Sequence, residues 1–319
     1  MSAFRDDLRA RARAAQHHIV LPEGDDPRVQ EAAARATAEG LARITLIASG
    51  PVPEGIARFD PDAAQRETLI EAFLKARRKK NPTRADAEAA LSDPLVAAAL
   101  MVRAGLADGT LGGAVATTAT TVRVALQMIG TAPDAPLVSS FFLMILPDHH
   151  PTRPGAPLIF SDCGLVVDPD ATQLAAIAQQ AAASFEQFVK REAAVAMLSF
   201  STRGSAAHPF VDKVTEAAEQ ARAKGLNVDG ELQFDAAFVP EIGASKAPGS
   251  KVAGHADVFI FPDLDAGNIG YKIAQRIGGA TALGPILQGL AKPANDLSRG
   301  CTSDDILDMI AVTSAQVRP

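Results

Sequence analysis

The chain contains no tryptophan, one tyrosine and two cysteines among its 319 residues. Without a series of aromatic rings there is nothing for successive nucleic-acid bases to stack on. A formal net charge of −6 also argues against a basic nucleic-acid surface. Cys163 and Cys301 lie far apart in the sequence and form no metal-spaced set, so we expect neither a disulfide framework nor a zinc site. We therefore expect no nucleic-acid partner, and a reducing cytoplasm as the setting.

Long hydrophobic runs are missing as well. No stretch approaches the roughly 20 apolar residues that a membrane-spanning helix needs. The segment up to His18 is charged and alanine-rich, without the apolar core of a signal peptide. These absences predict a soluble protein that does not engage a membrane and acts on a small molecule.

Strand-like and helical patterns alternate along the chain. Residues 18–22 and 43–48 are apolar and β-rich, and residues 26–39 between them have helical periodicity with Pro27 near the start. This βαβ pattern predicts a largely parallel, covered sheet. Because 319 residues exceed the usual size of one core, two domains are expected.

The same reasoning assigns most of the later segments. We expect further strands at residues 139–146, 158–161, 194–200, 236–239 and 257–262, helices at 63–106, 169–191 and 208–224, and a loop at 240–254.

One stretch near the end of the chain carries the clearest functional signal. An apolar run from Gly284 leads into a turn-rich loop with Ser298 and Arg299, and a helix opens at Thr302 or Ser303. Such a junction offers backbone N–H groups, a hydroxyl and a guanidinium fork together, which suits a phosphate or an acyl phosphate. The pattern is equally compatible with a plain helix cap beside one surface arginine.

Several ordered motifs carry a family resemblance. They are Gly284-Pro-Ile-Leu-Gln-Gly-Leu290, Asn295-Asp-Leu-Ser-Arg-Gly-Cys301, Val195-Ala-Met-Leu-Ser-Phe-Ser-Thr-Arg-Gly-Ser205, Asp229-Gly-Glu-Leu-Gln-Phe-Asp-Ala-Ala-Phe238 and Ala266-Gly-Asn-Ile-Gly-Tyr-Lys-Ile-Ala-Gln275, with weaker matches at Leu21-Pro-Glu-Gly24 and Asp108-Gly109. Together they resemble the phosphate acetyltransferase family, which includes the phosphate butyryltransferases.

The resemblance implies an α/β fold class: two three-layer α/β/α domains with an interdomain cleft, in an isocitrate-dehydrogenase-like architecture. The implied domains are residues 1–134 plus 286–319, and residues 135–285. The implied activity is reversible transfer of an acetyl group between acetyl phosphate and coenzyme A. Coenzyme A is then a substrate, no cofactor or metal is required, and a homodimer is expected.

The resemblance also implies roles for individual residues. Arg299 would bind the phosphoryl group, Ser298 would donate to the reacting carbonyl or thiol region, and Asp305 matches the proposed base. An ordinary aspartate and a thiol differ by about 4.6 pKa units, so Asp305 needs burial, or else a role in orienting the thiolate. The candidate substrate-binding residues are Arg28, Arg77, Thr118, Arg123, Ser201, Asn268, Lys272, Gln288 and Asn295. Of these, Arg77 falls at the coenzyme A site of the family.

Competing interpretations remain open. Propionyl or butyryl substrates fit the same motifs, because one methylene changes specificity by only about 1–3 kcal/mol. A non-catalytic acyl-CoA or acyl-phosphate sensing domain is favoured by Ala116 and Thr120, which replace a His and an Asp of the family pattern. A nicotinamide-dependent decarboxylating dehydrogenase lacks support, since no strand is followed by Gly-x-Gly-x-x-Gly. His149 and His150 have no third spaced ligand, so no metal site is expected there.

Overall fold

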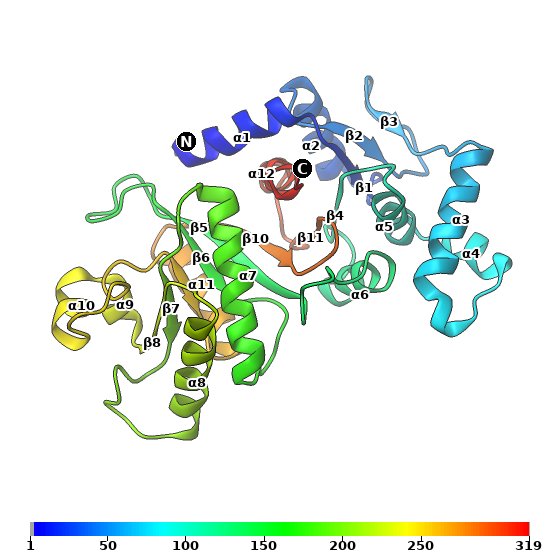
Figure 1. Cartoon of the computed structure of the whole chain (residues 1–319). Coiled ribbons are helices and arrows are strands. Elements are labelled where there is room, and N and C mark those ends of the chain that lie inside the picture. Colours follow the sequence, from blue (N-terminus) through cyan, green and yellow to red (C-terminus); the bar gives the residue numbers. More distant parts are fainter. Residues whose placement is uncertain (1–2, 319) are drawn as a thin grey trace. The chain divides into compact units, whose positions relative to one another are not determined.

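The computed structural model describes residues 3–318. These residues form two compact units (Figure 1). The first contains residues 3–134 and 290–318, and the second contains residues 135–289. The last part of the chain therefore belongs to the same unit as the first part.

The first unit is built on a five-stranded sheet in the order β11-β4-β1-β2-β3, with every adjacent pair parallel. Its elements are α1 (Ala3–Ala15), β1 (His18–Leu21), α2 (Pro27–Ala38), β2 (Arg43–Leu46), β3 (Ala57–Arg58), α3 (Ala63–Arg77), the 3-10 turn η1 (Arg78–Lys80), α4 (Arg84–Ala90), α5 (Pro94–Ala104), β4 (Gly109–Gly112), α6 (Thr118–Met128), β11 (Ala294–Asp296) and α12 (Ser303–Gln316). The predicted βαβ unit is confirmed by β1, α2 and β2.

Local sequence signals account for the helix boundaries in this unit. The side chain of Asp26 accepts a hydrogen bond from the N–H of Arg28, and Pro27 occupies the first position of α2. Helix α12 begins after Thr302 with a capping box, as the sequence predicts. Helices α1 and α2 both pack against α12, so the C-terminal helix completes the core of the first unit.

The second unit contains a six-stranded mixed sheet in the order β10-β5-β6-β9-β7-β8. Its elements are β5 (Ser139–Ile145), β6 (Pro157–Ser161), α7 (Ala171–Val189), β7 (Val195–Leu198), α8 (Pro209–Ala223), β8 (Val228–Leu232), α9 (Phe234–Phe238), α10 (Pro240–Lys246), β9 (Val258–Ile260), α11 (Leu264–Arg276) and β10 (Thr281–Gln288). The β6-β9-β7-β8 part is parallel, and β10 and β5 add antiparallel pairs. The structure confirms the α/β class.

One expected strand is wrong. Residues 236–239 lie in helix α9 or just after it, and the strand is β8, which begins at Val228, eight residues before the expected start. Strand β8 escapes detection because it contains Asp229 and Glu231. Both acids are buried and satisfied in the fold: Asp229 pairs with Arg203 and Arg222, and Glu231 accepts hydrogen bonds from hydroxyl groups. The expected loop at residues 240–254 also contains a short helix, α10.

None of the helices among residues 3–318 combines the length and the apolar character that crossing a membrane requires.

Candidate functional site

Three segments of the first unit meet at one edge of its sheet. Strands β1, β4 and β11 are adjacent and parallel, so the chain leaves all three at the same, carboxyl, edge. The exits are residues 22–28, 113–118 and 297–302. In open α/β sheets ligands bind at this edge, and the predicted Ser298-Arg299 loop is one of the three exits.

Arg28 connects the three exits. Its Nη1 donates to the carbonyl oxygens of Arg299 (2.8 Å) and Cys301 (3.0 Å), and its Nη2 donates to the carbonyl oxygen of Ala114 (2.8 Å). The remaining N–H groups donate to the Asp26 carboxylate, which supplies the anionic neighbour that a cation in the first turn of a helix requires. The hydrogen bond from Arg28 lowers the pKa of Asp26. All five N–H groups of Arg28 are thus used within the unit, and the side chain fixes the candidate loop.

Glu23 holds the second exit. Its carboxylate accepts hydrogen bonds from three successive backbone N–H groups, those of Ala114 (2.6 Å), Val115 (3.1 Å) and Ala116 (2.7 Å). Gly113 precedes them with φ +103°, and a Cβ there would lie 2.8 Å from the backbone N of Leu297. Only glycine tolerates this combination, so the turn after β4 lies directly against the chain after β11.

Asp296, the last residue of β11, is fully buried between these segments. Neither carboxylate oxygen has a hydrogen-bond partner among residues 3–318. Burial, and to a lesser degree the charge of Glu23, raises the pKa of Asp296 to about 6. The hydroxyls of Thr118 and Thr121 lie close enough to lower this pKa in part, without reaching hydrogen-bond geometry.

The candidate loop itself points outward. Ser298, Arg299 and Gly300 are exposed, and the loop closes on itself through the hydrogen bond from the N–H of Cys301 to the carbonyl oxygen of Ser298 (2.9 Å). Within the described part of the chain the Arg299 guanidinium makes no hydrogen bond or ion pair. Its backbone is therefore held by Arg28 while its side chain is available to an anion. Cys301 is buried, and burial raises the pKa of its thiol, in keeping with a packing role.

Two predicted residues face solvent on α6, the helix that begins at the same edge. Thr118 is the first residue of α6, and Arg123 follows a turn and a half later; both are exposed. Residues 117–121 form the start of the helix whose preceding turn Glu23 holds. Thr118 is thereby placed near the same edge as Arg299, and Arg123 lies in the same unit, midway along α6.

Asp305 is positioned by local structure. Its Oδ2 accepts hydrogen bonds from the backbone N and the Oγ1 of Thr302, each at 2.9 Å, and its own N–H donates to that hydroxyl. These bonds form the capping box of α12, and the side chain is exposed. The burial that a general base would need is absent, whereas a fixed, outward carboxylate close in sequence to Arg299 is present.

Three other predicted residues are buried in hydrogen-bond networks. The Asn295 amide donates to Thr313, the Gln288 amide donates to Ser139, and the Ser201 hydroxyl donates to Glu231. Each is at most 5% exposed. In this structure these side chains stabilise their own units.

The remaining predicted residues lie elsewhere. Arg77 ends α3 and is partly exposed. In the second unit, Lys272 donates to the Asn268 side chain (2.7 Å), which in turn donates to the carbonyl oxygen of Cys163 (3.1 Å). Asn268 and Lys272 therefore form one polar pair on α11.

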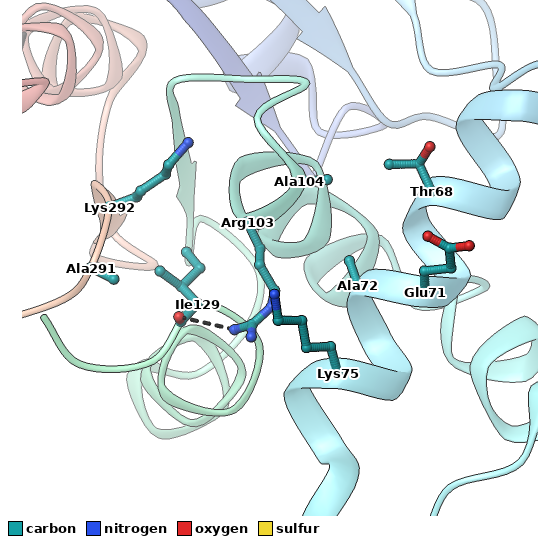
Figure 2. Close-up of a pocket in the computed structure, with 9 residues that line it drawn as sticks. All are labelled: Thr68, Glu71, Ala72, Lys75, Arg103, Ala104, Ile129, Ala291 and Lys292. Carbon is teal, nitrogen blue, oxygen red and sulfur yellow. Dashed lines mark hydrogen bonds between the residues drawn. The ribbon is translucent and has the colours of Figure 1, made fainter. Parts of the chain in front are cut away.

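A pocket of about 460 Å³ opens at the other edge of the first sheet (Figure 2). Arg103 precedes β4 and Lys292 precedes β11, so the pocket lies at the amino edge, away from the candidate loop. Arg103 donates to the carbonyl oxygens of Met128 and Ile129 at the end of α6, and Lys292 Nζ approaches Gly105 at the end of α5. Arg103 thereby satisfies carbonyl groups at the negative end of α6, which accounts for its position without a ligand.

Two carboxylates that shape this edge, those of Glu23 and Asp296, were not predicted from the sequence. Glu23 stands in the Leu21-Pro-Glu-Gly24 motif and Asp296 in the Asn295–Cys301 motif, so both segments were marked, but neither side chain was assigned a role. A carboxylate between Asn and an apolar residue gives no local sign that it is buried, because its burial depends on β4 and α6.

The fold and site define an α/β protein with an exposed Ser-Arg loop braced at the carboxyl edge of a parallel sheet. A family model described as phosphate acetyl/butaryl transferase matches residues 3–314. The chain is 53% identical to the phosphate acetyltransferase of Paracoccus denitrificans over 323 residues, covering 98% of this chain and 99% of the relative. It is 44% identical to that of Acetivibrio thermocellus over 328 residues, covering 99% and 98%. The chain belongs to the phosphate acetyl/butaryl transferase family.

Solved structures agree. A phosphotransacetylase from Streptococcus pyogenes matches with a TM-score of 0.91 and 44% identity, covering 99% of each chain. A branched-chain phosphotransacylase from Enterococcus faecalis matches with a TM-score of 0.71 at 18% identity, covering 95% of this chain and 100% of the other; it is similar in fold. The resemblance stated from the motifs is confirmed.

Proposed function

We propose that this protein is a phosphate acetyltransferase, an enzyme that reversibly converts acetyl-CoA and phosphate into coenzyme A and acetyl phosphate. The observation that carries the proposal is the Ser298-Arg299 loop: its backbone is fixed by Arg28 while the Arg299 side chain extends to solvent. Family membership and relatives named phosphate acetyltransferase support the same activity.

The chemistry needs an anion site, a hydrogen-bond donor and a positioned thiol. The planar Arg299 fork binds two oxygens of the phosphoryl group, and the Ser298 hydroxyl donates to the carbonyl oxygen on which negative charge develops. The coenzyme A sulfur attacks the carbonyl carbon, a C–S bond forms, and the C–O bond to phosphate breaks. The thiol proton passes to solvent water before or during the attack, and phosphate leaves with the electron pair of the broken C–O bond. Asp305, exposed and held by Thr302, orients the thiol group in this scheme.

Binding of the larger substrate falls to residues beyond the loop. We assign Arg123 and Thr118 to coenzyme A or phosphate contacts, since both are exposed on α6, the helix that begins at the carboxyl edge. Arg77 is assigned to coenzyme A on the family pattern. The acyl preference, acetyl against propionyl or butyryl, stays a matter for measurement.

The test follows the release of free thiol from acetyl-CoA with and without phosphate. Comparison covers the unaltered chain, Arg299→Ala, Ser298→Ala and a control, Arg58→Ala, which removes an exposed arginine of the same unit. Loss of one preorganised donor costs about 10²–10³-fold in kcat. Phosphate-dependent release that falls by this amount in Arg299→Ala and Ser298→Ala, and not in Arg58→Ala, supports the proposal. Binding of acetyl-, propionyl- and butyryl-CoA without turnover would favour the sensing domain instead.

We further propose that the reaction needs no metal or redox cofactor. Among residues 3–318 no group of three or more His, Cys, Asp or Glu side chains is arranged to hold a metal ion. Turnover should therefore survive dialysis against EDTA. Loss of activity on EDTA treatment, restored by a divalent ion, would contradict this.

We also propose a cytoplasmic homodimer. Helix α11 exposes Ile269 (57%) and Ile273 (53%), and Ile277 (84%) follows at the helix end. The spacing of four residues places all three on one helical face. An aliphatic stripe of this kind on a helix that buries only Gly267 in its own unit fits a contact with a second copy.

A further inference from the structure

The carboxyl group of Asp296 is buried and has no hydrogen-bond partner among residues 3–318. It lies at the end of β11, two residues before Ser298, and is 0% exposed. A buried polar group without a partner costs free energy, and an ionised carboxylate costs more than a neutral acid. The folded protein is therefore more stable when the Asp296 carboxyl carries a proton than when it is ionised.

Asp296 touches the turn that precedes Thr118. Its Oδ1 lies where a side chain on Gly113 would project, so the carboxyl packs against the backbone of the turn after β4. The hydroxyls of Thr118 and Thr121 approach the same carboxyl from α6. As a carboxylic acid Asp296 has an O–H to donate to one of these hydroxyls, and as a carboxylate it has none.

The charged groups around Asp296 decide when it gains that proton. Glu23, across the same turn, is the charged group that acts directly on it and is itself an anion. Arg28 has all its N–H groups on other acceptors, and the Arg299 and Arg123 side chains are exposed. An anion bound by Arg299, three residues after Asp296 in the chain, adds negative charge at this edge of the sheet. Both effects favour the protonated acid.

We propose that Asp296 is a positioning residue that takes up one proton from solvent when an anionic substrate binds at the Ser298-Arg299 loop, and then donates to Thr118 or Thr121 and fixes the turn after β4. The proton comes from the buffer and returns to it when the anion leaves, so no bond other than O–H changes. This inference rests on the proposed function, because the bound anion is the phosphate or acyl phosphate of that reaction.

Linkage makes the proposal measurable. If binding favours protonation of Asp296, anion affinity rises as the pH falls through the interval between the pKa values of the bound and free protein, by about tenfold for each unit that binding shifts the pKa. Inorganic sulfate is a suitable probe, since its charge is constant from pH 5 to 8, unlike that of phosphate. We expect sulfate to compete with phosphate, to bind more tightly near pH 6 than near pH 8, and to be bound with net proton uptake in calorimetry across buffers of different ionisation enthalpy.

Three variants decide the assignment. Asp296→Asn should bind sulfate with an affinity that no longer depends on pH, without proton uptake. Asp304→Asn removes an exposed carboxylate of α12 and should keep both the pH dependence of sulfate affinity and the proton uptake. Thr121→Val, nearly isosteric, removes a hydroxyl that lowers the pKa of Asp296, so the pH dependence should move to higher pH. The last variant keeps the proposal testable if Asp296→Asn fails to fold.

The outcomes separate the inference from the proposed function. Phosphate-dependent turnover together with a sulfate affinity that keeps the same pH dependence in Asp296→Asn overturns the role of Asp296 and leaves the function standing. A failure of sulfate to compete with phosphate also overturns it. Absence of turnover in the unaltered chain, measured in the same preparation, counts against the function instead.

Discussion

Arg28 and Arg299 are 271 residues apart in sequence, and the guanidinium of the first donates to the backbone carbonyl oxygen of the second at 2.8 Å. One arginine therefore sets the backbone of the other. Because Arg28 holds its backbone, the exposed Ser298-Arg299 loop keeps a defined conformation without regular secondary structure.

Replacing Arg28 by alanine should lower kcat/KM for phosphate about 10- to 100-fold, because the carbonyl oxygens of Arg299 and Cys301 lose their shared donor and the loop loosens. Steady-state kinetics on purified protein measures the change. Arg35→Ala, on the same helix, removes a pair to the exposed Asp304 and should change kcat/KM by less than about threefold. Equal losses in the two variants would contradict the role of Arg28 in fixing the loop.

Asp305 and Thr302 share one capping box but should differ in kinetics. Each of Thr302→Ala and Asp305→Asn should lower the free energy of unfolding by about 1 kcal/mol, since both weaken the cap of α12. Only Asp305→Asn should also lower kcat, by about 100-fold, because the thiol loses the group that orients it. Urea unfolding and initial rates measure the two effects. A kcat for Asp305→Asn equal to that of Thr302→Ala would mean that Asp305 only caps α12 and takes no part in the reaction.

Asp296 should make the protein less stable at alkaline than at acidic pH. Its folded-state pKa of about 6 lies above the ordinary value of 3.8, so its contribution to stability is fully present below pH 3.8 and is lost as the pH rises through about 6. The loss amounts to about 3 kcal/mol at most. Asp296→Asn, which cannot ionise, should gain about 1–3 kcal/mol in free energy of unfolding at pH 8 relative to the unaltered chain, and nothing at pH 4.

Urea unfolding at the two pH values measures this, with Asp304→Asn as the control for an exposed carboxylate. A gain of the same size at both pH values would mean that packing, and not ionisation, accounts for the effect.

Ile273→Lys should convert the proposed homodimer to a monomer. A lysine at the centre of the α11 stripe puts a charge where two copies would bury apolar surface. Light scattering after size-exclusion chromatography gives the mass. Lys251→Ala, an exposed change elsewhere in the same unit, should leave the mass unchanged. A mass that stays the same in Ile273→Lys would place the contact on another face.

Sequence patterns identified most elements of both units because their signals are local. Pro27 after Asp26, Asp305 three residues after Thr302 and the apolar run at residues 139–146 each act within a few positions. Strand β8 does not follow from such local signals, because its two acids are satisfied by residues outside the strand. Asp229 pairs with Arg203 and Arg222, and Glu231 accepts hydrogen bonds from the hydroxyls of Ser201 and Thr215.

The sequence by itself determined the α/β class, the family and the Ser298-Arg299 loop, because periodicity, caps and motifs are written in neighbouring residues. Tertiary structure alone decided that Arg28 braces the loop, that Glu23 holds the turn after β4, and that Asp296 is buried without a partner. The physical reason is that the hydrogen-bond partners of Arg28 and Glu23, and the burial of Asp296, depend on which distant segments of the chain meet. Here β1, β4 and β11 bring together residues separated by up to about 270 positions, and only their parallel pairing places those side chains at one edge.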